Sequence, residues 1–108
     1  MSELRDKINK SMSEAEYLAQ IISLLELLGW EYYHVFEQRA YARRTSKGFP
    51  DIVAIRHTRV LFLEVKSERG KVSPEQKTWL NALKATGNEA YVLRPSDWEA
   101  VVALLKRE

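Results

Sequence analysis

Residues 51–66 read DIVAIRHTRVLFLEVK, two apolar, β-branched runs on either side of the dipeptide His57-Thr58. This pattern predicts a β-hairpin with strands over residues 51–56 and 59–66. His-Thr is not a preferred hairpin dipeptide, so the register depends on a turn centred between these two residues.

Such a turn brings three charged residues to one face of the hairpin. Asp51 and Glu64 are directly opposite each other, with Cβ atoms roughly 4.5–5.5 Å apart. Lys66 lies on the same face as Glu64, because side chains alternate along a strand. The hairpin therefore predicts a cluster of two acids and one lysine.

This cluster has two interpretations. Two facing carboxylates repel each other, and a divalent cation between them removes the repulsion. Because the chain has no cysteine, oxygen ligands favour Mg²⁺, with Mn²⁺ as a substitute, over zinc. Lys66 would then supply a positive charge suited to a water nucleophile or to charge developing on a phosphate. The alternative is an exposed network of charged side chains on a solvated strand face.

The rest of the chain alternates helical and strand patterns around this hairpin. Apolar residues at helical spacing, capping residues and glycine stops predict helices over residues 13–28, from Ser73 to Gly87, and from a capping box at Ser96 through Leu105. Further strands are expected over residues 30–36 and 89–94. The order α-β-β-β-α-β-α predicts an α/β fold with a mixed sheet. Residues 1–12 are expected to be a polar lead-in to a single domain over residues 13–108.

The first helix offers a third acid. Glu14 falls in the middle of the apolar stripe of this helix, and Glu16 falls on the opposite face. An acid on a buried stripe needs a partner, and a metal is one. Acids are also favoured in any first turn, and both Ser11 to Glu14 and Ser13 to Glu16 fit a capping box.

The positive charges are unevenly distributed. The formal net charge is only +2, but residues 38–50 carry four cations and no carboxylate: Arg39, Arg43, Arg44 and Lys47. Beside a phosphodiester-cleaving site, such a loop is expected to contact the phosphate backbone; elsewhere it would be an ordinary solvated loop. Tyr41 is the aromatic residue best placed to join it.

Three motifs together resemble a known family. They are KGFPDIV (residues 47–53), EVK (residues 64–66) and GKVSPEQ (residues 70–76). In this order they closely resemble the VRR-NUC family of the PD-(D/E)XK nuclease superfamily. The resemblance runs from about Ser13 to the C-terminus and implies a restriction endonuclease-like αβββαβ core, with a mixed central sheet flanked by helices.

The resemblance also implies roles for individual residues. Asp51 and Glu64 would be metal ligands, with the backbone carbonyl of Val65 as a further ligand and Lys66 as the catalytic lysine. Gln76 would be an active-site residue, although it is equally explained as the capping-box partner of Ser73. The first-helix glutamate of the family aligns best with Glu14, and Glu16 remains possible.

We therefore expect a Mg²⁺-dependent DNA endonuclease. Free-standing members of the family resemble Holliday junction resolvases, which implies a homodimer acting on four-way junctions. The dimer surface would come from the helix over residues 98–105 or from the first strand. The alternatives are a nicking, flap or restriction-type nuclease of the same chemistry, or a non-catalytic DNA-binding subunit. With no apolar leader or membrane span in its sequence, the chain is expected to be cytoplasmic, and bacterial or phage-encoded.

Overall fold

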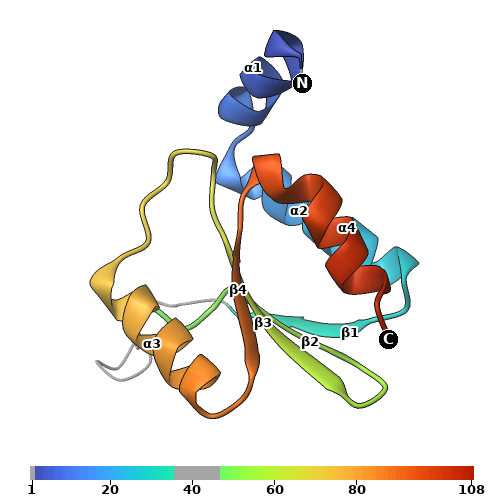
Figure 1. Cartoon of the computed structure of the whole chain (residues 1–108), viewed down its shortest axis with the longest axis vertical. Helices are drawn as coiled ribbons and strands as arrows, with labels where there is room; N and C mark the ends of the chain where they lie inside the picture. Colours follow the sequence, from blue (N-terminus) through green and yellow to red (C-terminus); the bar gives the residue numbers. More distant parts are fainter. Residues whose placement is uncertain (1, 36–46) are drawn as a thin grey trace.

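A computed structural model describes residues 2–35 and 47–108 of the chain. Its centre is a four-stranded sheet in the order β1-β2-β3-β4 (Figure 1). The strands are β1 (Glu31–His34), β2 (Ile52–Arg56), β3 (Arg59–Val65) and β4 (Glu89–Leu93). The first three are antiparallel, and β4 runs parallel to β3. The predicted α/β fold with a mixed sheet is confirmed, and the architecture is compatible with a restriction endonuclease-like fold.

The predicted hairpin register is also confirmed. Arg56 pairs with Arg59 across a two-residue turn, and the same register continues to the pair Ile52 and Leu63. The turn adopts this geometry despite its unfavourable dipeptide because His57 takes a φ of 54°. Two-residue hairpin turns need a positive φ at the first loop position, and His57 accepts that cost.

Helices cover the two faces of the sheet differently. One face packs against α2 (Glu14–Leu27) and α4 (Trp98–Lys106), and the other face packs against α3 (Pro74–Ala85) (Figure 1). The main core lies on the first face, where both helices meet β2 and β3. Its members are Tyr17, Ile21, Leu25, Trp30, Ile52, Ala54, Leu61, Leu63, Val65, Leu93, Val101 and Leu105.

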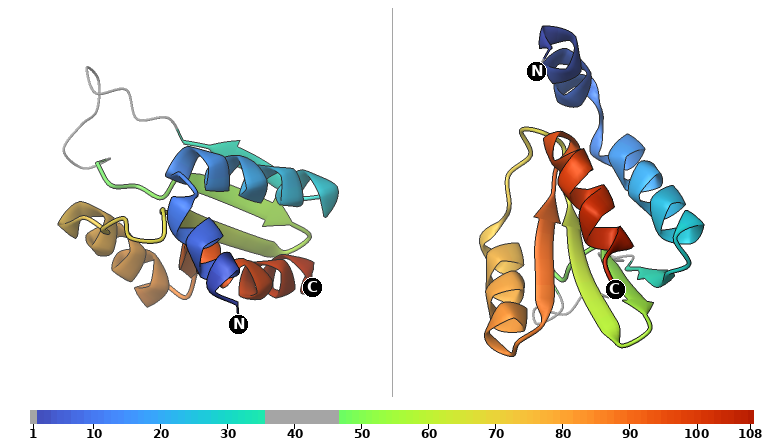
Figure 2. Two further views of the ribbon diagram at one scale, coloured as in Figure 1. Left: turned by 90° about the horizontal axis from the view of Figure 1, so that it is seen from above. Right: turned by 45° about the vertical axis from the view of Figure 1, so that its right-hand side comes forward.

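The N-terminal segment departs from the prediction. Residues expected to form only a polar lead-in contain a helix, α1 (Glu3–Ser11), with Ser2 as its N-cap. None of its residues is buried, and it contacts the short 3₁₀ helix η1 (Pro95–Asp97). Figure 2 shows α1 standing away from the sheet at one end of the molecule. The helix was missed because its polar composition gives little sign of a buried face.

The start of the last helix also differs. Ser96 does not form the predicted capping box; its amide donates to Glu68 Oε1 at 3.0 Å instead. Asp97 accepts a hydrogen bond from the Arg94 amide at 2.9 Å, which closes η1, and α4 begins only at Trp98. Pro95 explains the difference, because its fixed φ favours a tight turn immediately after β4.

No helix in residues 2–35 and 47–108 is both long and apolar enough to cross a membrane.

Candidate active site

Asp51 and Glu64 meet at the open end of the β2–β3 hairpin, as the antiparallel register requires. Two hydrogen bonds hold Asp51 there. Its Oδ2 accepts from the Val65 amide at 2.8 Å, and its backbone carbonyl accepts from the Val35 amide at 2.7 Å. The Asp51 carboxylate is therefore fixed against β3 at the edge of the site.

Glu64 is the buried member of the pair, with only 1% of its surface exposed. Its Oε2 accepts a hydrogen bond from Gln76 Nε2 at 2.8 Å and lies 3.6 Å from Lys66 Nζ. Its Oε1 is buried as well, and no donor in the described part of the chain reaches it. One of the two carboxylate oxygens of Glu64 is therefore buried without a hydrogen bond to any described residue.

The surroundings of Glu64 oppose its ionisation. Burial, followed by the negative charge of Asp51, raises the pKa of Glu64 to about 8, although the Lys66 ammonium lowers it. Protonated Glu64 can share its proton with Asp51 in a hydrogen bond, and this bond and the charge of Glu14 raise the pKa further. Without a bound cation, the two carboxylates therefore resist carrying two negative charges together at neutral pH.

Gln76 is both the capping-box partner of Ser73 and a neighbour of Glu64, the two roles that the sequence suggested for it. Its backbone amide and side-chain oxygen form the capping box with Ser73, at 3.2 and 2.8 Å. The remaining Nε2 points to Glu64. The cap thus fixes the orientation of the amide and directs its N–H toward the carboxylate, so the structural role supports the site role.

Gly48 connects the segment before Asp51 with the start of α3. It has a φ of 86°, and a Cβ at this position would lie 2.6–2.7 Å from backbone atoms of Glu75 and Gln76. Any larger residue would therefore push the Asp51 segment away from α3. Next to it, the Phe49 ring packs edge-on against Trp79, with ring centroids 4.9 Å apart, which holds this junction together.

Lys66 is positioned by the turn that follows it. Its amide donates to the Leu93 carbonyl at 3.0 Å, which continues the parallel pairing of β3 with β4. Arg94 Nη1 then donates to the carbonyls of Ser67, Glu68 and Gly70, at 2.7–3.2 Å. This guanidinium clamps the turn. A Cβ at Gly70 would lie 3.6 Å from Lys66 Cδ, so the clamped turn passes within van der Waals reach of the lysine stem.

The third acid is not brought into direct contact with the pair. Glu16 forms the capping box with Ser13 through hydrogen bonds of 2.8 and 3.0 Å. Of the two candidate acids, only Glu14 is therefore left to act at the site. Glu14 is exposed and acts on Glu64 through its charge. Across residues 2–35 and 47–108, no group of three His, Cys, Asp or Glu side chains is close enough to hold a metal ion.

Comparison with protein-family models matches the chain to the VRR-NUC domain over residues 4–97. The chain belongs to the VRR-NUC family. This is a nuclease domain family, and a nuclease domain implies DNA as the substrate. The match begins at residue 4, within the segment predicted as a lead-in. No curated protein and no solved structure gives a significant match.

The cations predicted to contact DNA are only partly placed in this VRR-NUC domain. Arg39, Arg43 and Arg44 lie outside the described residues, whereas Lys47 is exposed one residue before Gly48. Lys71, on the segment leading into α3, is exposed as well. The assignment of these side chains to DNA binding stays a prediction.

Two positioning residues of the site were not predicted from the sequence. Gly48 appeared only as a letter of the KGFPDIV motif, and a glycine three residues before the acid was the available signal. Arg94 carried no signal, because an arginine at the end of a predicted strand is ordinary. Its role follows from the parallel pairing of β3 and β4, which brings it beside the turn after Lys66.

Proposed function

We propose that this chain is a metal-dependent, structure-selective DNA endonuclease that hydrolyses phosphodiester bonds, with four-way junctions as its preferred substrate. The observation that carries the proposal is the buried Glu64 beside Asp51: one of its oxygens accepts no hydrogen bond from the described residues, and Lys66 and Gln76 lie against the other. Lys66 and Gln76 satisfy only one oxygen of this carboxylate, which leaves Oε1 available for a ligand.

The residues present fit a hard divalent cation such as Mg²⁺ or Mn²⁺. Asp51 and Glu64 would hold it together with the carbonyl of Val65, and all of these donors are oxygen atoms. The repulsion between the two carboxylates and the unused Oε1 both favour a cation there. Glu14 would contribute through its charge or through a bound water. When bound, the ion would polarise the phosphate and lower the pKa of a water molecule.

Lys66 and Gln76 would supply the remaining functions of the site. Lys66 carries the positive charge nearest to Glu64, so its ammonium would orient the attacking water or neutralise charge that develops on the phosphate. Gln76 would keep Glu64 in one rotamer, because its own amide is locked by the helix cap. Gln76 lies on α3, and Lys66 directly follows β3 and continues its pairing with β4 through the backbone, so both are held as a preorganised site requires.

A homodimer on a four-way junction is the finer part of the proposal. Of the two surfaces suggested for a dimer, α4 packs Val101 and Leu105 into the core of its own chain. The sheet beside the first strand instead exposes apolar surface, with Tyr33 66% and Ile55 50% exposed. This favours β1 and β2 as the dimer surface, and two-fold symmetry suits a substrate with two equivalent strands.

The deciding experiment compares DNA substrates under matched conditions. The protein is incubated with linear duplex, flap and four-way-junction DNA in Mg²⁺, in Mn²⁺ and in EDTA, while light scattering gives its mass in solution. We expect a dimer, metal-dependent paired incisions near the branch point, and poor cutting of linear duplex. A monomer that cuts only flaps would refute the resolvase-like assignment, and binding without cleavage in either metal would refute the enzyme assignment.

A further inference from the structure

The turn that follows Lys66 separates its hydrogen-bond donors from its acceptors. Three carbonyls of the turn, at Ser67, Glu68 and Gly70, all accept from the one nitrogen atom Nη1 of Arg94. In a trans peptide bond the N–H points opposite to the carbonyl, and the described chain has no cis peptide bond. The amides of residues 68, 69 and 71, which directly follow these carbonyls, therefore point away from Arg94.

Positive charge accompanies these amides. The side chains of Arg69 and Lys71 are exposed, and within residues 2–35 and 47–108 neither forms an ion pair. No hydrogen bond in this part of the chain uses the amides of residues 68, 69 and 71. These three amides and two side chains make up the outer face of the turn, and the protein leaves all of their donor groups unused.

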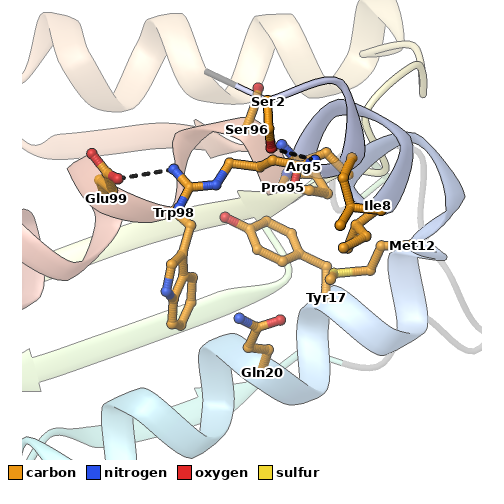
Figure 3. Close-up of a pocket in the computed structure, with 12 residues that line it drawn as sticks. Ser2, Arg5, Ile8, Met12, Tyr17, Gln20, Pro95, Ser96, Trp98 and Glu99 are labelled. Atoms are coloured by element: carbon orange, nitrogen blue, oxygen red, sulfur yellow. Dashed lines mark hydrogen bonds and ion pairs between the residues drawn. The ribbon is translucent and has the colours of Figure 1, made fainter.

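The acid of the turn is held on the opposite side. Glu68 Oε1 accepts a hydrogen bond from the Ser96 amide of η1 at 3.0 Å. Helix α1 contacts η1 from beyond, and Figure 3 shows Pro95 and Ser96 beside Arg5 of α1. The inner side of the turn is therefore closed by the end of β4 and by η1, which leaves the outer face open to a ligand.

A face that carries donors without acceptors suits a partner that offers acceptors alone. The phosphate oxygens of a DNA backbone are such acceptors, and they carry the negative charge that Arg69 and Lys71 would neutralise. Base edges carry donors as well as acceptors. The outer face is therefore suited to hold a DNA strand and not to read its sequence.

The turn also lies next to the candidate active site. Lys66 comes directly before it, and a Cβ at Gly70 would lie 3.6 Å from Lys66 Cδ. At its other attachment, Arg94 directly follows β4, which pairs with β3 as far as Val65 and Leu93. A strand held on the outer face would therefore be kept at a fixed distance from Lys66 and the carboxylate pair.

We propose that the turn over residues 67–71 binds the phosphate backbone of the DNA strand that is cut, with Arg69 and Lys71 as its charged contacts. Arg94 is the positioning residue of this surface, because it holds the carbonyls inward and thereby the amides outward. The proposal rests on the proposed nuclease function, since it brings substrate DNA to Lys66, but it concerns binding and not the chemical step.

The test measures DNA binding by the whole protein in EDTA, where no strand is cut. Anisotropy of end-labelled linear duplex and four-way-junction DNA gives the affinity over a series of salt concentrations. Arg69→Gln combined with Lys71→Gln should flatten the plot of log K against log salt by about 1.8, because each phosphate contact contributes about 0.9. The affinity at physiological salt should fall at least roughly tenfold.

Lys84→Gln combined with Lys106→Gln is the charge-matched control. Both lysines are exposed near the C-terminal ends of α3 and α4, and this double variant loses the same positive charge. Its salt plot should keep the wild-type slope. A difference between the two double variants is then due to the position of the charges and not to the net charge.

Two variants of Arg94 test the orientation of the turn. Arg94→Gln leaves Arg69 and Lys71 in place but releases the carbonyls, so it should weaken DNA binding roughly three- to tenfold. Arg94→Lys can donate to the same carbonyls from one nitrogen atom, as the arginine does, and should restore most of the affinity. Thermal melts establish that each variant is folded. Wild-type affinity in Arg94→Gln would overturn the positioning role.

The same measurements separate this proposal from the nuclease proposal. If wild type cuts DNA in Mg²⁺ but the two double variants share one slope, the turn is rejected and the nuclease proposal stands. If wild type does not cut DNA but the slopes differ as expected, the nuclease proposal is rejected and the turn remains a DNA contact. Wild type that binds neither DNA would reject both.

Discussion

The two ends of the β2–β3 hairpin each bring two like charges together, but they differ in how those charges are compensated. At the turn, the guanidinium groups of Arg56 and Arg59 lie 4.7 and 5.5 Å from the centre of the Trp30 ring. Arg59 also bonds both oxygens of Glu89 at 2.9 Å. Arg56 donates to backbone carbonyls at the ends of α2 and α4, which are the sites where cations stabilise helices.

At the open end, the like-charged pair is compensated less fully. Asp51 and Glu64 face each other with Lys66 as the nearby cation, and one buried oxygen of Glu64 has no donor among residues 2–35 and 47–108. The hairpin thus shows a stabilised end and a destabilised end built on the same register. Local destabilisation that the rest of a fold tolerates is expected where a site must bind something.

The largest expected effect comes from removing either acid at the open end. Asp51→Asn or Glu64→Gln should lower cleavage by at least roughly a thousandfold, because each removes a metal ligand. Each substitution also relieves repulsion, so the melting temperature in EDTA should stay level or rise. Gel-based cleavage assays and thermal melts check both halves, and wild-type cleavage by either variant would contradict the metal site.

Lys66→Ala should lower turnover by roughly a hundred- to a thousandfold while metal binding is retained, because bulk solvent does not replace a cation positioned for the transition state. Calorimetric titration with Mn²⁺ is the measurement that separates the two roles. Complete loss of Mn²⁺ binding would mean that Lys66 holds the site together and does not take part in catalysis.

The third prediction concerns the pH dependence of stability without metal. The pKa of Glu64 is raised from 4.5 to about 8 in the folded protein, so folding favours the protonated acid. This contribution is fully present below pH 4.5 and is lost as the pH rises toward 8. Urea unfolding in EDTA at pH 5, 6.5 and 8 should show wild type losing stability relative to Glu64→Gln across this series. Parallel curves for the two proteins would show that Glu64 is ionised throughout.

The hairpin and its acid pair could be predicted because they depend on local patterns. Alternation of apolar residues determines which side chains share a face, and the two-residue turn determines which residues are opposite each other. The sequence predicted each of the two roles of Gln76 but not that both occur together. They do so because the cap and the contact with Glu64 use different atoms of one amide.

Contacts between segments that are distant in the sequence were harder to predict. Gly48 matters because α3 approaches it closely, and Arg94 matters because β4 pairs with β3. Helix α1 was missed because polar residues dominate its sequence, although Leu4 and Ile8 recur at helical spacing.

The smallest effect on cleavage is expected at the turn end of the hairpin. A substitution there should lower stability and leave the cleavage rate nearly unchanged. Arg59→Ala removes a nearly buried guanidinium and its paired hydrogen bonds to Glu89, so the free energy of unfolding should fall by about 2 kcal/mol. Because the carboxylate pair lies at the other end of β3, the cleavage rate of the folded protein should change less than about twofold.

Arg107→Ala is the matched control. It removes a 3.2 Å contact with the same Glu89 from an exposed side chain, and it should lower the free energy of unfolding by at most about 0.5 kcal/mol. Chemical denaturation and single-turnover cleavage, both at one pH, measure the two quantities. If Arg59→Ala lowered cleavage as strongly as it lowered stability, the two ends of the hairpin would be coupled, and the contrast between a structural end and a catalytic end would not hold.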